Sequence, residues 1–343
     1  KGIGFSYGIM SHWWSPAFHS SIVLSTNAPS QETYSFGTYK DIVINNFSFG
    51  AQLIVLPYKN FNKDKIYFSG LKAHITYNSN PEITFGFYRT YLSGNFSNLQ
   101  NFTTGIKNWS IKDAALLVIE PLFGQSKKEL SYTTPGTPGF DMWDEILSGY
   151  VKLNFPDDYL EIYIELASDD NRGNLTDFKA HWDHTLGYII GYKKIFYVNN
   201  WTILSAAEYL STKISNTFAP DFYRGNPNIN NYYDKSIYDY FSYKGRRMGA
   251  HSGSSSDDLI YMIGFGKEKS MLFISYNMEQ HGIKSRAFNE KKSELSVSYN
   301  FELFEKHSFY ISLEYESVQN FGFVENRFSD SKLIWIGYTL SIF

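Results

Sequence analysis

The sequence predicts an all-β fold in which most of the chain forms one large antiparallel sheet. Stretches of about ten residues alternate apolar and polar side chains, which is the period of a β-strand. The connections between these stretches are alternately very short and very long. Tyr and Phe are abundant, at 28 and 29 of 343 residues, yet no apolar run approaches the length of about 20 residues that a membrane-spanning helix needs.

The strands can be placed in chain order from this alternation. The first forty or so residues show no clear pattern. The ranges with alternating side chains are 47–55, 66–77, 82–92, 147–155, 159–168, 185–195, 201–211, 259–265, 272–278, 295–301, 309–315 and 334–342. We therefore expect twelve or more strands, with further ones in the first forty residues or lost before the N-terminus.

The last strand illustrates the pattern, and the connections indicate its setting. Ile334, Ile336 and Tyr338 fall on one face, whereas Gly337 and Thr339 fall on the other. Every second connection is a short turn, and the intervening loops reach about forty residues. This asymmetry is typical of outer-membrane barrels. The sequence thus predicts a large antiparallel transmembrane β-barrel with short periplasmic turns and long extracellular loops.

A soluble β-sandwich is the alternative, because its strands also alternate in period two. Strands in globular proteins are commonly about 5–6 residues long, shorter than those expected here. The predicted inner face also carries many ionisable side chains, which a water-filled lumen can hold and a dry core cannot. They are Lys72, His74, Glu161, Glu165, Lys193, Glu208, Glu294, Glu314 and Glu316. Both observations favour the barrel.

The composition narrows the classes of function. The 31 basic and 34 acidic residues are interspersed, with a net charge of −3 and no basic stripe, so we expect no nucleic-acid partner. The absence of Cys excludes disulfides and thiolate metal sites. The sequence starts without a signal peptide; because a membrane barrel is exported, we expect a trimmed mature chain or a fragment. Residues 1–343 are expected to form a single barrel domain.

Several sequence blocks resemble the Wzi-like capsule assembly proteins, and they occur in the order of that family. The first is His12–Pro29, which resembles the family's Trp-Trp-Gly-Pro block with Ser15 in place of Gly. The next, Phe68–Lys72 followed by Glu82–Arg89, is similar to a family hairpin, with Lys72 where Arg is common. Tyr243–His251 is similar to the family's Gly-Arg-x-Leu-Gly-His stretch, with Ala250 inserted.

This resemblance implies a barrel of about eighteen strands in the outer membrane of a Gram-negative bacterium. It also implies a protein that binds capsular or other surface polysaccharide and holds it at the cell surface, as a lectin-like anchor and not an enzyme. The expected partners are therefore this polysaccharide and outer-membrane lipid. A monomer is compatible with this interpretation, and the sequence leaves the oligomeric state open. An outer-membrane channel and a structural subunit of a cell-envelope complex are the alternatives.

Sugar binding requires aromatic faces for pyranose rings, with polar side chains nearby for the hydroxyl groups. Two long loops combine these residue types. The candidate carbohydrate-binding residues are Trp109, Tyr132, Trp143, Tyr223, Arg224, Tyr232, Tyr233, Tyr238, Tyr240 and Arg246. The alternative is that these side chains pack the loops into a lid over the barrel mouth. Trp13 and Trp14 are expected to have a structural role.

No catalytic residue, cofactor or metal is expected. His251 with the following serines and Asp258 is the strongest hydrolytic candidate, but adjacency in sequence does not supply the convergence that a serine mechanism needs. His181, Asp183 and His184 have spacings that could ligate a metal. We expect them to be exposed residues of a polar loop.

Overall fold

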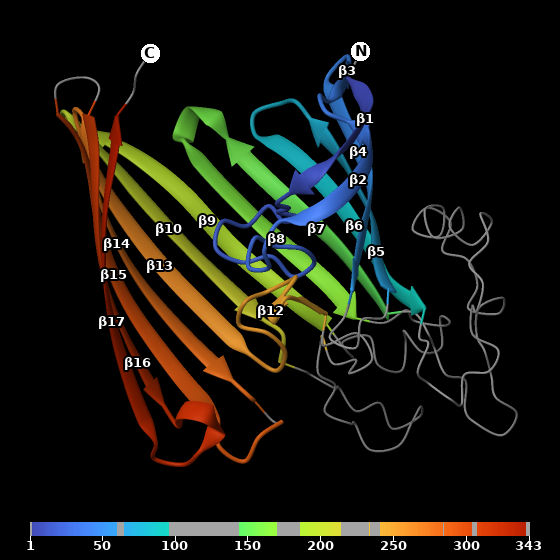
Figure 1. Cartoon of the computed structure of the whole chain (residues 1–343). Coiled ribbons are helices and arrows are strands. Elements are labelled where there is room, and N and C mark those ends of the chain that lie inside the picture. Colours follow the sequence, from blue (N-terminus) through green and yellow to red (C-terminus); the bar gives the residue numbers. More distant parts are fainter. Residues whose placement is uncertain are drawn as a thin grey trace, which may run out of the picture.

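A computed structural model gives the fold and describes residues 2–59, 65–95, 144–169, 186–213, 233, 241–283, 285–303 and 307–340. One antiparallel sheet dominates it, and each main strand pairs with the next one along the chain (Figure 1). The hydrogen-bonded order is β1-β2-β4-β5-β6-β7-β8-β9-β10-β13-β14-β15-β16-β17. The prediction of an all-β fold with a large antiparallel sheet is therefore confirmed. None of the described helices is long and apolar enough to cross a membrane.

Every range with alternating side chains coincides with a strand, although several strands extend beyond the predicted ranges and β1 to β3, β11 and β12 were not placed. In the first half they are β1 (Ile3–Met10), β2 (Gln31–Thr38), β3 (Ile42–Ile44), β4 (Phe47–Lys59), β5 (Lys65–Tyr77), β6 (Glu82–Asn95), β7 (Asp144–Phe155) and β8 (Leu160–Asp169). In the second half they are β9 (Leu186–Val198), β10 (Trp201–Ser211), β11 (Ser242–Tyr243), β12 (Arg246–Arg247), β13 (Asp257–Lys267), β14 (Ser270–His281), β15 (Glu290–Leu303), β16 (His307–Gln319) and β17 (Phe328–Leu340). Two short 3-10 helices, η1 (Pro156–Asp158) and η4 (Phe321–Phe323), lie in connections.

The strands are long enough to cross the hydrocarbon of a bilayer. From β4 to β10 and from β13 to β17 they have 10 to 14 residues, and a transmembrane strand needs about 9–11. The tight turns after β5, β7, β9 and β13 lie at one end of the sheet, and the longer connections after β14 and β16 lie at the other (Figure 1). We call these the short-turn end and the long-loop end. The predicted alternation of connections is confirmed for these parts.

The two faces of the sheet differ in chemistry as predicted. On β16, Ile311, Leu313 and Tyr315 project from the outer face with 40%, 50% and 43% exposure. Glu316, one residue on, lies on the inner face and forms an ion pair with Lys292 of β15. The antiparallel register places Leu313 between Val297 and Ile334, so apolar side chains form continuous rows across neighbouring strands. This is the surface that a lipid environment requires.

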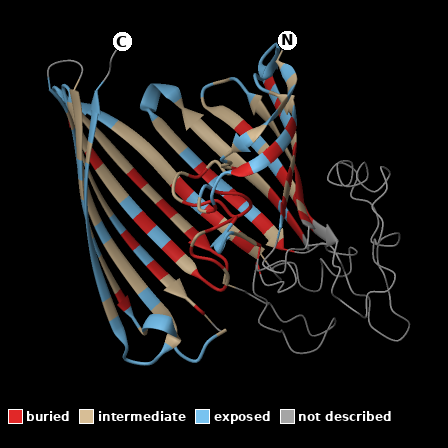
Figure 2. Cartoon of the chain, viewed as in Figure 1, coloured by how far each residue is buried: buried red, intermediate tan, exposed pale blue. Residues whose placement is uncertain are grey.

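The chain between β1 and β2, residues 11–30, lies inside the curved sheet (Figure 1), and we call it the lumen segment. Buried residues gather around it, whereas β15 to β17 are largely exposed or intermediate (Figure 2). β1 and β17 are the two edge strands, and no pairing between them occurs among the described residues. β17 is consequently exposed on both faces, with Trp335 at 59% and Ile336 at 74%.

Candidate functional site

The lumen segment is held to the inner wall of the sheet by two buried glutamates. The backbone N–H groups of Phe18, His19 and Ser20 donate to the Glu208 carboxylate at 2.8, 3.1 and 2.7 Å. The Tyr163 hydroxyl donates to the same carboxylate at 2.7 Å. The backbone of the lumen segment is irregular, so its N–H groups have no partners within a helix or a sheet. The Glu208 carboxylate supplies the acceptor for these buried donors.

Glu165 on β8 repeats this arrangement nearby. It is fully buried and accepts hydrogen bonds from Ser15 at 2.5 Å and from Ser148 at 2.7 Å. Glu165 and Glu208 were both predicted to lie on the inner face, and the structure confirms this position. Their environment differs from the prediction, because the lumen beside them is filled by protein and is not open water.

Apolar contacts complete the attachment of the lumen segment. Trp14 is 1% exposed and belongs to one buried cluster with Ile22 and Leu24 of the segment and Ile54 and Phe68 of the wall. The backbone N–H of Trp14 donates to the Leu24 carbonyl at 2.8 Å, which closes the segment on itself. Because burial of an aromatic ring stabilises by both area and packing, Trp14 is a structural anchor, as expected from the sequence.

A second stretch, residues 241–256, covers the lumen segment from the long-loop end, and we call it the capping loop. The Ser25 N–H donates to the Met248 carbonyl at 2.6 Å, and the Ser25 hydroxyl donates to the Gly249 carbonyl at 2.6 Å. Asn27 donates to the Arg247 carbonyl at 3.0 Å. Segments far apart in sequence are thus joined by hydrogen bonds inside the barrel, and they form one body.

His12 sits at the start of the lumen segment in a partly buried, uncharged state. Burial lowers its pKa to about 4, and the nearby positive charge of Lys72 acts in the same direction. The Thr33 hydroxyl already donates to the Gln31 carbonyl, so His12 Nε2 is the donor to Thr33, at 2.9 Å. Neutral His12 therefore helps to fix the segment.

Acidification should loosen the lumen segment through this histidine. Because the folded pKa of His12, about 4, lies below the unfolded value of 6.5, its contribution to stability is present above pH 6.5 and is lost as the pH falls toward 4. We expect faster hydrogen exchange in residues 11–30 at pH 4.5 than at pH 7.5, after correction for intrinsic rates. In His12→Gln, which keeps a donor but cannot titrate, this pH dependence should be smaller. An equal pH dependence in both proteins would contradict the assignment.

Charged side chains line the wall beyond the capping loop. Lys292 lies 3.1 Å from Glu279, 3.2 Å from Glu294 and 3.2 Å from Glu316. His281 lies 3.0 Å from Glu279 and also contacts the Ser252 carbonyl at 2.9 Å. The network therefore links the inner faces of β14, β15 and β16 to the capping loop. It confirms that the inner face there is ionic.

The hydrolytic candidate of the sequence does not assemble in the described residues. The Ser256 hydroxyl contacts Ser252, Gly253 and Thr212, and no described serine hydroxyl is hydrogen-bonded to His251. His251 instead faces Asp258 of β13 and His19 of the lumen segment, and these are the described His and acidic residues that could hold a metal ion together. The other candidate metal ligands, His181, Asp183 and His184, lie outside the described residues.

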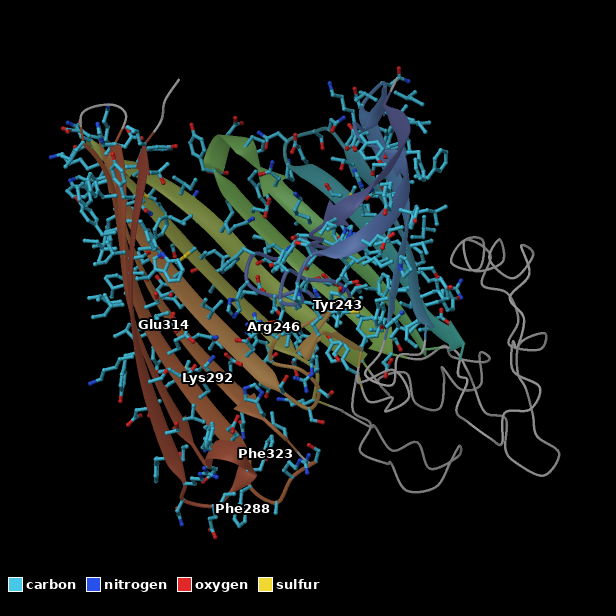
Figure 3. The ribbon with its side chains drawn as sticks, in the orientation of Figure 1. Tyr243, Arg246, Phe288, Lys292, Glu314 and Phe323 are labelled. Carbon is cyan, nitrogen blue, oxygen red and sulfur yellow. The ribbon has the colours of Figure 1, made fainter. Side chains whose placement is uncertain are left out.

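A cavity of about 680 Å³ opens between the capping loop and the connection from β14 to β15. Its lining is rich in hydrogen-bond donors and includes one aromatic ring: Arg247, His251, Ser252, Ser254, His281, Gly282, Ser285, Arg286, Glu290 and Phe323. The Arg286 guanidinium stacks over the Phe323 ring at 5.1 Å. Figure 3 places Phe323, Phe288 and Lys292 at this long-loop end of the sheet.

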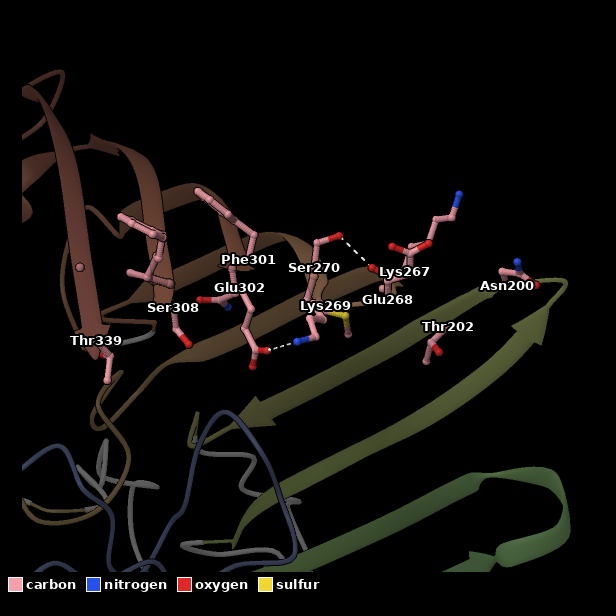
Figure 4. A pocket seen from close by; sticks show the side chains of 16 residues that line it. Asn200, Thr202, Lys267, Glu268, Lys269, Ser270, Phe301, Glu302, Ser308 and Thr339 are labelled. Atoms are coloured by element: carbon pink, nitrogen blue, oxygen red, sulfur yellow. Dashed lines mark hydrogen bonds and ion pairs between the residues drawn. The ribbon is translucent and has the colours of Figure 1, made fainter. Parts of the chain in front are cut away.

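A second cavity, of about 620 Å³, lies at the short-turn end of the inner wall between β10 and β17 (Figure 4). Polar groups line much of it: Lys269 faces Glu302 at 3.7 Å, and the Ser270 hydroxyl donates to the Lys267 carbonyl at 2.9 Å. Both members of this ion pair are about half exposed, so it contributes little stability. The wall from β13 to β17 is thus accessible at both ends.

Most of the candidate carbohydrate-binding residues lie outside the described residues: Trp109, Tyr132, Trp143, Tyr223, Arg224, Tyr232, Tyr238 and Tyr240. Of the two that are described, Tyr233 is 1% exposed; its hydroxyl donates to the Ile22 carbonyl at 2.6 Å and accepts from the Ala250 N–H at 3.0 Å. Burial raises the pKa of Tyr233 well above its usual range, which keeps this hydroxyl protonated. Arg246 is exposed on β12, within the capping loop (Figure 3).

Sequence reasoning missed the cavity at the long-loop end because its lining comes from three separate connections. Arg286 and Phe323 carry no motif that would associate them. The signal in the sequence that could have found it is the connection before the last strand, which is rich in Asn and Phe.

No protein-family model and no curated protein matches the sequence. The structure is similar to Wzi, an outer membrane protein involved in group 1 capsule assembly in Escherichia coli and described as a carbohydrate-binding β-barrel. The TM-score is 0.62, with 10% identity over 97% of this chain and 66% of that chain. The channel DcaP of Acinetobacter baumannii gives a TM-score of 0.35, with 6% identity over 91% of this chain and 85% of that one. BamA of Haemophilus ducreyi gives 0.41, with 9% identity over 90% of this chain and 62% of that one.

The similarity to Wzi shows that this chain shares the fold of that β-barrel. The resemblance predicted from the sequence blocks is confirmed at the level of fold. The chain spans just under two thirds of the length of the Wzi chain.

Proposed function

We propose that this protein is a bacterial outer-membrane barrel that binds surface polysaccharide noncovalently at its long-loop end. The observation that carries the proposal is the donor-rich cavity beside the capping loop, placed in a fold similar to that of a carbohydrate-binding barrel. The protein acts as an anchor without catalysis. Its apolar outer face, exemplified by Leu313, is the surface that contacts lipid.

The chemistry of the cavity suits an acidic sugar. Arg247 and Arg286 both line the cavity, and a guanidinium group can donate to a carboxylate in a bidentate manner. The hydroxyls of Ser252, Ser254 and Ser285 can bind sugar hydroxyl groups as donors or acceptors. Phe323 supplies an apolar face for a pyranose ring. Many such weak contacts along a repetitive chain would add up to firm attachment.

Binding of purified protein to the surface polysaccharide extracted from its own host tests this proposal. Arg286→Ala should weaken binding about tenfold, because a hydrogen bond to a charged group contributes about 1.5–3 kcal/mol. Arg327→Ala is the matched control, since Arg327 also stacks on a phenylalanine, Phe321, at 5.1 Å but does not line the cavity. Absence of binding by the unmodified protein, or equal losses in the two variants, would refute the proposed site.

A transport channel is the second candidate, because both cavities open on the inner wall and β15 to β17 lie to one side of the lumen segment (Figure 1). Conductance in planar bilayers separates the two functions. A large open conductance that polysaccharide does not change would favour transport. A low conductance combined with polysaccharide binding would favour the anchor.

A further inference from the structure

Three parts of the protein meet at a pair of histidines and one aspartate. His19 belongs to the lumen segment, His251 to the capping loop and Asp258 to strand β13. The Nε2 atoms of His19 and His251 lie 3.3 and 3.1 Å from the same oxygen, Asp258 Oδ2. The two imidazole rings stand nearly perpendicular, at 81°, with their centroids 4.8 Å apart. The cluster is therefore one of the points where the interior of the barrel is joined to its wall.

The carboxylate at the centre of this cluster is buried, and two histidines share one of its oxygens. The Asp258 side chain is 0% exposed, yet neither of its carboxylate oxygens has a hydrogen-bond partner. A buried carboxylate without well-aligned hydrogen bonds is costly, so the site favours positive charge beside Asp258.

We infer that His19, His251 and Asp258 form a binding site for Zn²⁺ or a similar divalent transition-metal ion. Zinc binds histidine nitrogen at about 2.0–2.1 Å and carboxylate oxygen at about 2.0–2.2 Å in a tetrahedron, which sets neighbouring ligand atoms about 3.4 Å apart. The two nitrogen–oxygen separations of 3.3 and 3.1 Å are close to this spacing. All three ligand atoms lie within 4.8 Å of one another, so a small rotation of the imidazoles brings them onto one ion.

The residue types select the class of ion. Two imidazoles with one carboxylate suit zinc, copper, nickel or iron, whereas calcium and magnesium prefer a shell made only of oxygen. The side chains of Asn277 and Glu279 border the site: Asn277 Nδ2 lies 3.5 Å from His19 Nε2, and Glu279 Oε1 lies 3.8 Å from His251 Nε2. His251 also lines the cavity of about 680 Å³, which gives an ion a path to the site.

The bound ion has a structural role, because its ligands come from three separate segments. It cross-links the lumen segment and the capping loop to β13, beside the contacts that Glu208 makes with the backbone of the same segment. This role is independent of polysaccharide binding, so failure of one proposal leaves the other standing.

Titration of the detergent-solubilised, chelator-treated protein with Zn²⁺ alone tests the site. We expect one ion per chain by calorimetry and by elemental analysis. His251→Gln and Asp258→Asn should each weaken binding at least about tenfold. The matched control is His74→Gln, which removes another histidine–aspartate pair, His74 Nε2 to Asp41 Oδ2 at 2.9 Å, that has no second imidazole. Absence of binding, or equal affinity in all variants, overturns the site.

Co²⁺ provides a second measurement that needs no variant. Bound at this site in the unmodified protein, it should give the strong visible absorption of a four- or five-coordinate ion, and added Zn²⁺ should abolish it. A weak spectrum of an octahedral, water-rich ion would overturn the assignment even if the variants fail to fold. Heat-modifiable mobility on gels reports whether each variant has formed its barrel.

Discussion

Replacing Glu208 by Ala should release the lumen segment from the barrel wall. The carboxylate accepts three backbone N–H groups, from Phe18, His19 and Ser20, and the hydroxyl of Tyr163. Truncation leaves these four donors without their acceptor in a buried place, and each such donor costs about 1–3 kcal/mol. We expect the free energy of opening the segment to fall by at least about 3 kcal/mol.

Hydrogen exchange of residues 11–30 measures this opening directly. Exchange of the Phe18, His19 and Ser20 amides should accelerate by more than about a hundredfold, whereas amides within β14 to β16 should keep their protection. Glu314→Ala is the control, because this glutamate also lies on the inner wall but contacts none of the described residues of the lumen segment. Unchanged exchange in Glu208→Ala would mean that the apolar cluster around Trp14 holds the segment by itself.

The strands of this fold could be predicted because the outer face of each main strand is apolar, which gives the sequence an alternation of period two. The range 201–211 was placed as β10 is found, since Trp201, Ile203 and Tyr209 fall on one face and Thr202 and Glu208 on the other. Further strands were expected in the first forty residues, but β1 was not placed, although Ile3, Phe5, Tyr7 and Ile9 alternate, because its inner side carries no charges. β17 begins at Phe328, whereas the predicted range begins at 334. The charged side chains of Asp330 and Lys332 lie on the otherwise apolar face and interrupt the alternation there.

The interior could not be predicted in the same way, because its contacts join residues far apart in sequence. The charged inner face was expected, but nothing in the spacing of Glu165 and Glu208 indicates that they bind the lumen segment. The block from His12 to Pro29 was distinctive without a periodic pattern. The lumen segment has an irregular backbone, so its apolar side chains do not recur with a fixed spacing in the sequence. Its position inside the sheet therefore follows only from the three-dimensional structure.

Leu313→Lys should destabilise the membrane-embedded barrel by about 2–4 kcal/mol if Leu313 lies near the middle of the bilayer. Its side chain is 50% exposed on the outer face, within the apolar row of Val297 and Ile334, where an ammonium group would meet hydrocarbon. Ser312→Lys is the matched control, because the neighbouring side chain points to the ionic inner face. Reversible unfolding by guanidinium in lipid vesicles measures both variants. Equal losses would mean that the two faces of β16 meet similar surroundings, which a lipid-embedded barrel does not allow.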